Sequence, residues 1–118
     1  MAELHGLAHR LQKFAEVRDW ERFHTPKNLT MALAGEVGEL LAELQWLTPA
    51  ESSTAMEDPR FATRLRSEVG DVMIYLTRLA DVLGIDLVEA AHAKLDESEE
   101  RYSVAEYHGS ARKAPPLA

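Results

Sequence analysis

The sequence predicts an all-α protein of one domain with four main helices. Apolar residues recur at spacings of three and four along most of the chain, which is the period of an amphipathic helix. Three X-Pro pairs, Thr25-Pro26, Thr48-Pro49 and Asp58-Pro59, are typical of a helix N-cap followed by proline at the first helical position. The length of 118 residues is that of a single domain.

The first predicted helix runs from Glu3 to Val17 and is followed by a polar and aromatic connector, residues 18–24. The second begins at Pro26 and ends near Thr48, because proline at position 49 prevents its continuation. Its leucine and valine side chains form one stripe that we expect to be buried. The residues of this stripe are Leu29, Leu33, Val37, Leu40, Leu44 and Leu47.

Residues 48–58 are predicted to form a loop with one short turn at most. The third helix then runs from Pro59 to Leu83, and Gly84 suits the left-handed position that ends it. Its apolar stripe comprises Leu65, Val69, Val72, Leu76, Leu79 and Leu83. Apolar stripes this wide on short helices predict a symmetric oligomer, since the helices of one chain do not cover one another completely.

The fourth helix is predicted from Leu87 to Tyr102, with Asp86 as its N-cap. From residue 103 the composition turns to glycine, serine, lysine and proline, which predicts an extended tail without a core of its own. The expected organisation is therefore a helical domain over residues 1–102 and a tail over residues 103–118.

Composition and charge exclude several classes of function. A net charge of −7 is the wrong sign for a protein that binds a nucleic-acid polymer. The absence of cysteine excludes disulfides, thiolate nucleophiles and cysteine-based zinc sites. No apolar run is long enough to span a membrane, and the N-terminal residues lack the apolar core of a signal peptide. We therefore expect a cytoplasmic protein.

Two acidic pairs lie beside these leucine stripes, at Glu36-Val-Gly-Glu39 and Glu68-Val-Gly-Asp71. A spacing of three places both carboxylates of a pair on one helix face, with their Cβ atoms roughly 5–6 Å apart. Burying several negative charges without a cation is costly, whereas Mg²⁺ binds carboxylate oxygens and keeps positions for water and phosphate. The pattern predicts a Mg²⁺ site, in which Mn²⁺ can substitute.

A second interpretation of these acids is structural. In it, they are boundary residues that form ion pairs with basic side chains elsewhere in the chain. The candidates for such pairs are Arg18, Arg22, Arg64 and Lys94.

The acidic motifs carry a resemblance to a known family. EVGEL at 36–40 followed by EVGD at 68–71 resembles the ExxE and ExxD signature of the MazG-like all-α NTP pyrophosphatases. The segments at 18–29 (RDWERFHTPKNL), 44–46 (LQW) and 71–87 (DVMIYLTRLADVLGIDL) resemble the dCTP pyrophosphatase branch of that family. The resemblance covers about residues 8–102.

The resemblance implies a four-helix fold assembled as a homodimer or tetramer, with an active site completed across a subunit contact. It also implies Mg²⁺-dependent hydrolysis of a deoxynucleoside triphosphate, expected to be dCTP or a modified dCTP, to the monophosphate and pyrophosphate. The Mg²⁺ ligands that it implies are Glu36, Glu39, Glu68 and Asp71, with Glu36 or Glu39 acting on the attacking water.

The base pocket that the resemblance implies consists of Trp20, His24, Trp46 and Tyr75, whose flat rings suit a pyrimidine. The candidates for phosphate or sugar contacts are Arg22, Lys27, Asn28 and Lys94. Two positions depart from the family pattern, because Ser98 stands where an asparagine is usual and Ser103 where a proline is usual. The contact made at residue 98 is therefore expected to change, which predicts a relaxed substrate preference.

Three alternatives to a dCTP pyrophosphatase stay open at the level of sequence. The first is a dUTP or broad dNTP pyrophosphatase, and the second is a phosphoribosyl-ATP pyrophosphohydrolase. The third is a catalytically silent helical oligomer that uses its acidic interior as a structural metal site.

Overall fold

The computed structural model of this protein describes residues 2–117, which form helices and connecting turns with no strand in that range. The all-α prediction is therefore confirmed. Contacts divide the chain into two compact units, Met1–Gly84 and Ile85–Ala118.

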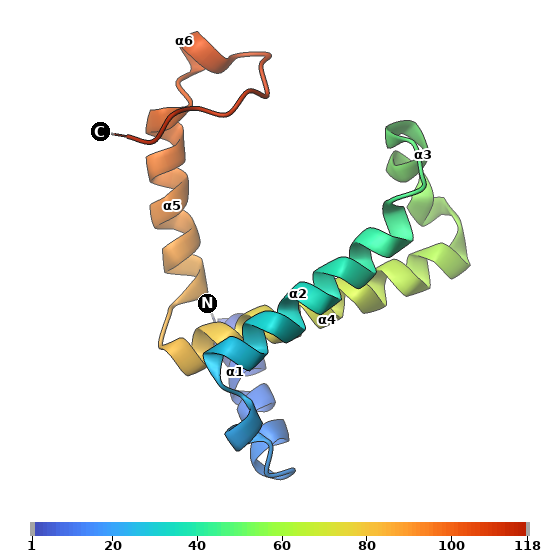
Figure 1. The fold of residues 1–118 in the computed structure, drawn as a ribbon, viewed down its shortest axis with the longest axis vertical. Coiled ribbons are helices and arrows are strands. Elements are labelled where there is room, and N and C mark those ends of the chain that lie inside the picture. The colour runs from blue at the N-terminus through green and yellow to red at the C-terminus, as the bar shows by residue number, and fades with distance from the viewer. Residues whose placement is uncertain (1, 118) are drawn as a thin grey trace. The chain divides into compact units, whose positions relative to one another are not determined.

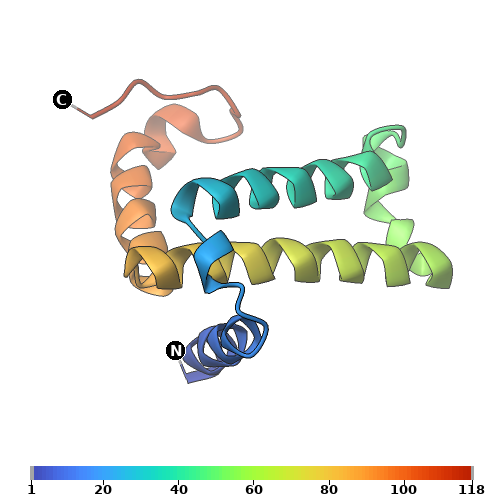
Figure 2. The ribbon, with the colours of Figure 1, turned by 60° about the horizontal axis from the view of Figure 1, so that its bottom comes forward.

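The first unit is built around a helical hairpin (Figures 1 and 2). Helices α2 (Pro26–Leu44) and α4 (Pro59–Leu83) lie side by side and antiparallel, and α1 (Ala2–Glu16) packs against α4. The short 3₁₀ helix η1 (Glu21–Phe23) connects α1 to α2. The hairpin positions the two acidic motifs, since each lies on one of its two arms.

All three N-caps predicted in front of a proline form. The Thr25 hydroxyl accepts a hydrogen bond from the Asn28 amide at 3.2 Å, which begins α2. The Asp58 carboxylate accepts from the amides of Arg60 and Phe61, at 2.9 and 3.4 Å, and so begins α4. The predicted end of α4 is also confirmed, because Gly84 has a φ of 70° and a left-handed conformation.

The third N-cap begins a helix where the sequence predicts mostly loop. Thr48 and Glu51 form a capping box, in which each side chain bonds the other's backbone amide, at 2.8 and 3.2 Å. It begins α3 (Pro49–Ser53), and the 3₁₀ helix η2 (Ala55–Glu57) follows. Two short helices thus replace the predicted loop, because the capping box satisfies amides that a loop would expose.

The core of the first unit is smaller than the predicted apolar stripes. Leu29 and Leu65 are buried as predicted, 2% and 9% exposed. Val37 and Val69 were predicted in the same stripes, but they are 47% and 53% exposed. The prediction of burial is wrong for them within one chain, because each arm of the hairpin is covered by fewer helices than its apolar face could contact.

The second unit contains α5 (Leu87–Arg101) and the short α6 (Val104–Tyr107). The prediction of a wholly extended tail is wrong for residues 104–107, and Tyr107 and Ala114 are buried. The Arg101 guanidinium donates to the Ala114 carbonyl at 2.6 Å, and the Tyr102 hydroxyl accepts from the Ala114 amide at 3.1 Å. These bonds hold the tail where its sequence has no helical period. The domain boundary at residue 102 stays a prediction.

Within residues 2–117, no helix is both long enough and apolar enough to cross a membrane. The cytoplasmic location stays a prediction.

Candidate metal centre and ligand cavity

The hairpin of α2 and α4 brings the two acidic motifs together. Glu36 and Glu39 come from α2, and Glu68 and Asp71 come from α4. One carboxylate oxygen from each of the four residues lies within 4.8 Å of the others. Since the helices run antiparallel, each pair faces the other across the hairpin, as the spacing of the motifs predicts.

The pKa values of two of these carboxylates are raised. Burial raises the pKa of Glu36, and a hydrogen bond with Glu39 and the negative charges of Glu39, Asp71 and Glu68 raise it further. Burial also raises the pKa of Glu68, followed by the hydrogen bond with Glu39 and its neighbours' charges. The Oε2 atoms of Glu36 and Glu68 are buried and have no hydrogen-bond partner in the described part of the chain.

No basic side chain neutralises this cluster. Arg64 bonds Glu43 at 3.0 Å, and Arg22 bonds Asp19 at 2.8 Å. Arg18 donates to the carbonyl of Phe14. Among residues 2–117, none of the four carboxylates has an ion-pair partner. The interpretation of these acids as members of structural ion pairs is therefore wrong.

The donor set fits a hard divalent cation. It contains four carboxylates and no nitrogen or sulfur ligand, which is the chemistry that Mg²⁺ and Mn²⁺ prefer. The two buried oxygen atoms without partners, on Glu36 and Glu68, are the atoms that a cation would satisfy. The residues present thus suit the predicted metal.

A cavity of about 430 Å³ adjoins the cluster at Asp71. It lies among α1, the connector that follows α1, and α4. Apolar side chains make most of its wall, and aromatic rings of Phe14, Trp20 and Tyr75 contribute to it. The residues that line it are Leu7, Arg10, Leu11, Phe14, Trp20, His24, Asp71, Ile74, Tyr75 and Arg78.

The connector is held in place by its own contacts. Asp19 adopts a φ of 54°, which few residues other than glycine and the Asx residues tolerate, and turns the chain back toward α1. The Trp20 amide then donates to the Ala15 carbonyl at 2.9 Å. The Trp20 ring packs edge-on against Phe14, with ring centroids 5.6 Å apart. This fold-back places Trp20 and His24 in the cavity wall.

His24 is bonded to a residue that the sequence prediction missed. The Nε of Arg78 donates to Nδ1 of His24 at 3.1 Å, and Arg78 is only 7% exposed. Burial lowers the pKa of His24, and the positive charge of Arg78 lowers it further. The spacing holds a signal for Arg78, because it follows Asp71 by seven residues and Tyr75 by three, which places all three on one helix face.

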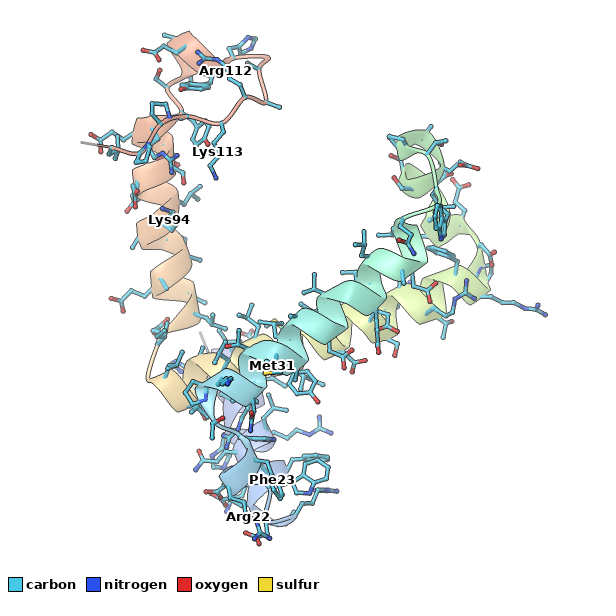
Figure 3. The ribbon with its side chains drawn as sticks, in the orientation of Figure 1. Arg22, Phe23, Met31, Lys94, Arg112 and Lys113 are labelled. Atoms are coloured by element: carbon cyan, nitrogen blue, oxygen red, sulfur yellow. The ribbon has the colours of Figure 1, made fainter. Side chains whose placement is uncertain are left out.

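The remaining predicted binding residues of the first unit do not line the cavity. Trp46 lies beyond the end of α2, is 86% exposed and does not line the cavity. Arg22, which lies on the connector (Figure 3), is paired with Asp19. The Asn28 side chain on α2 donates to the Phe23 carbonyl at 3.1 Å. Lys94 lies on α5 in the second unit and pairs with Glu97 at 3.2 Å. Lys27 is exposed.

The chain is similar to several known proteins. Residues 24–104 match the family model of the MazG nucleotide pyrophosphohydrolase domain. The chain is 45% identical over 105 residues to dCTP pyrophosphatase 1 of Rattus norvegicus, and 44% identical to the protein of that name in Homo sapiens. Each alignment covers 89% of this chain but only 62% of the relative.

A solved structure is also similar. The crystal structure of a pyrophosphatase from Archaeoglobus fulgidus superimposes with a TM-score of 0.79 and 35% sequence identity. The match covers 86% of this chain and 93% of that one. With its acidic hairpin, its all-α fold and these similarities, the chain belongs to the MazG nucleotide pyrophosphohydrolase domain family.

Proposed function

We propose that this protein is a nucleoside triphosphate pyrophosphohydrolase. It converts a deoxynucleoside triphosphate and water to the monophosphate and pyrophosphate, and it prefers dCTP or a modified dCTP. The observation that carries this proposal is the junction at Asp71, where a cluster of four carboxylates meets a cavity with aromatic walls. Such a junction suits a ligand with a phosphate chain at one end and a flat ring at the other. The relatives named dCTP pyrophosphatase 1 support the choice of base.

Glu36, Glu39, Glu68 and Asp71 would hold Mg²⁺, which when bound supplies positive charge to the phosphate oxygens. Glu36 or Glu39 orients the attacking water and accepts its proton. Glu39 is the exposed member of the cluster, which favours it for contact with solvent water. The water oxygen forms a bond to the α-phosphorus, the bond from that phosphorus to the oxygen shared with the β-phosphate breaks, and pyrophosphate leaves with the electron pair.

In this proposal, the base lies in the cavity against Trp20, His24 and Tyr75. Exposed Trp46 completes the pocket from a second subunit, since it does not reach the cavity of its own chain. Among the candidates for phosphate contacts, Lys27 is the most available, because it forms no hydrogen bond or ion pair within residues 2–117. Arg22, Asn28 and Lys94 already bond neighbours in their own units.

The test is a pyrophosphate-release assay with dCTP, 5-methyl-dCTP, dUTP, dTTP, dATP and CTP, each with Mg²⁺ and with EDTA. We expect the highest kcat/KM for dCTP or its 5-methyl form, and no release in EDTA. Selectivity among pyrimidines should be moderate, because stacking alone discriminates weakly between bases. dUTP as the best substrate would support the dUTP alternative. A purine as the best substrate, or no cleavage of any nucleotide, would overturn the assignment.

A further inference from the structure

Most polar side chains that line the cavity have a direction of hydrogen bonding fixed by their own chemistry, but two do not. Arg10, Trp20 and Arg78 can only donate, and Asp71 belongs to the carboxylate cluster. Tyr75 can donate and accept. His24 is different, because a neutral imidazole donates from one nitrogen and accepts at the other, and its environment decides which.

The contact with Arg78 determines which nitrogen of His24 carries the proton. The Nε–H of Arg78 points at Nδ1 of His24 at 3.1 Å, and a guanidinium nitrogen donates but never accepts. Nδ1 must therefore present its lone pair, so the single proton of the neutral ring lies on Nε2. Burial and the charge of Arg78 both lower the pKa of His24, which keeps the ring neutral.

Arg78 is itself held in position. It is 7% exposed, it projects from the C-terminal part of α4, and its NH1 lies 3.5 Å from a carboxylate oxygen of Asp81 on the next turn. A side chain tied at both ends of its guanidinium has little freedom to release His24. The orientation of the imidazole is therefore set before a ligand enters.

We propose that Arg78 is a positioning residue that fixes His24 as the Nε2–H tautomer, so that the cavity offers a donor to an acceptor on the edge of a pyrimidine base. This inference rests on the proposed function. With His24 donating, the polar side chains that line the cavity are donors, apart from Asp71 and the Tyr75 hydroxyl. Cytosine has two adjacent acceptors, N3 and O2, whereas uracil and thymine carry a donor at N3. A donor at this position can therefore bond N3 of cytosine but not N3 of uracil or thymine, which favours cytosine.

The tautomer is tested without any substrate. Protein with ¹⁵N-labelled histidine is examined by long-range ¹H–¹⁵N NMR at about pH 8, where an ordinary histidine is neutral. A His24→Asn spectrum assigns the resonance among the five histidines. We expect an unprotonated Nδ1 and a protonated Nε2. A protonated Nδ1 in the wild-type protein would overturn the inference, even if dCTP hydrolysis is found.

Three variants test whether the tautomer of His24 affects the preference for dCTP over dUTP. Arg78→Met removes the donor, and Arg78→Lys keeps a group that can only donate. Arg60→Met is the matched control, because Arg60 is an exposed arginine on the same helix and does not line the cavity. In Arg78→Met, we expect the ring to exchange between tautomers. KM for dCTP should rise roughly tenfold with little change in kcat, as expected for the loss of one hydrogen bond.

Arg78→Lys should restore the wild-type NMR pattern and most of the preference for dCTP over dUTP. Arg60→Met should change neither. If Arg78→Met fails to fold, the wild-type and Arg78→Lys spectra still decide the tautomer. If a folded Arg78→Met protein keeps the wild-type ratio of kcat/KM for dCTP to kcat/KM for dUTP, the role of Arg78 in selectivity is overturned. Failure of the wild-type protein to cleave any nucleotide would instead overturn the proposed function and leave the tautomer to the NMR result.

Discussion

At the scale of single residues, the acidic cluster is the feature that most needs explanation. Glu36 and Glu68 each bury a carboxylate oxygen without a partner within residues 2–117, and their negative neighbours lie close by. An unpaired buried charge is expensive, so this arrangement is unfavourable for the protein alone. A divalent cation would offset these charges, which is why the cluster is a candidate metal site.

We expect Glu39→Gln and Asp71→Asn each to lower kcat by about 100-fold or more at saturating Mg²⁺. The loss of groups that only orient metal ligands already costs 10–100-fold in other sites, and these residues are proposed as the ligands themselves. Pyrophosphate release measures the loss. Glu43→Gln is the matched control, because Glu43 lies one turn further along α2 and pairs with Arg64. Wild-type turnover in Glu39→Gln would disprove the assignment.

Substitutions within the acidic cluster should not unfold the protein. In EDTA, Glu68→Gln should melt at a higher temperature than the wild type, since it removes a buried negative charge from among three others. A lower melting temperature in EDTA would show that the cluster is stabilised by something other than a cation.

His24 predicts a dependence of stability on pH. Its folded-state pKa lies below the ordinary value of 6.5, so the unfolded chain binds a proton at this position more readily. The stability that neutral His24 contributes is therefore present above pH 6.5 and is lost as the pH falls through the folded-state pKa. Besides Arg78, Glu21 acts on this ring, and its charge works in the opposite direction.

Urea unfolding of the metal-free protein at about pH 7.5 and about pH 5.5 checks this prediction. The free energy of unfolding should fall more steeply in the wild type than in His24→Gln. His108→Gln, at an exposed histidine of the second unit, is the control and should behave as the wild type. An equal fall of the free energy of unfolding between the two pH values in wild type and His24→Gln would contradict a neutral, half-buried His24.

At the scale of elements, α4 carries most of the site. Glu68, Asp71, Tyr75 and Arg78 all project from it, so its start determines whether they are in register with α2. The Asp58 cap fixes that start, and Gly84 fixes its end. The connector contributes Trp20 and His24 through a turn at Asp19, not through a regular helix.

We expect Asp58→Ala to destabilise the protein by about 1 kcal/mol, because the first amides of α4 lose their acceptor. The melting temperature should fall by roughly 4 °C in a calorimetric scan. Turnover at low temperature should be nearly unchanged, since the carboxylates lie more than two turns away along the helix. Glu57→Ala, beside the cap but not part of it, is the control. If Asp58→Ala lowers the melting temperature less than Glu57→Ala does, the cap is ruled out as a determinant of stability.

At the scale of the whole molecule, the first unit exposes many large apolar side chains. Met31 on α2 is 64% exposed (Figure 3), and Leu41 on the same helix is 59% exposed. On α4, Val69 and Met73 line a second, open and mostly apolar cavity with Met56. Apolar area of this extent is typical of a surface that another subunit covers. It supports the proposal of a dimer or tetramer.

Light scattering coupled to size-exclusion chromatography should therefore give a dimer or tetramer at micromolar concentration. Met73→Glu places a charge in the apolar cavity and should lower the measured mass or the stability of the oligomer. Arg60→Glu, a change of charge at the exposed start of α4, should leave the mass unchanged. A stable and active wild-type monomer would contradict both the oligomer and the pocket shared through Trp46.

The sequence alone determined the four main helices and the spacing of the acidic residues. Pro26 and Pro59 mark where α2 and α4 begin, and the two acidic pairs keep a spacing that places them on one face of each helix. These features are local, because hydrogen bonds between residues three or four apart fix them. At the tail, the structure differs from the prediction because α6 forms there. In that region Arg101 donates to the carbonyls of Ala114 and Pro115, 13 and 14 positions away.

Only the tertiary structure decided which side chains meet. The pairing of Arg78 with His24 joins residues 54 positions apart, and no period in the sequence reports it. The exposure of Val37 and Val69 is likewise set by how many helices cover each face, whereas a stripe reports only that the face is apolar. Helical pattern is a property of neighbouring residues, but burial and contact depend on packing between elements. The acidic cluster could be predicted because it needed one antiparallel pair, while the cavity needed three segments to converge.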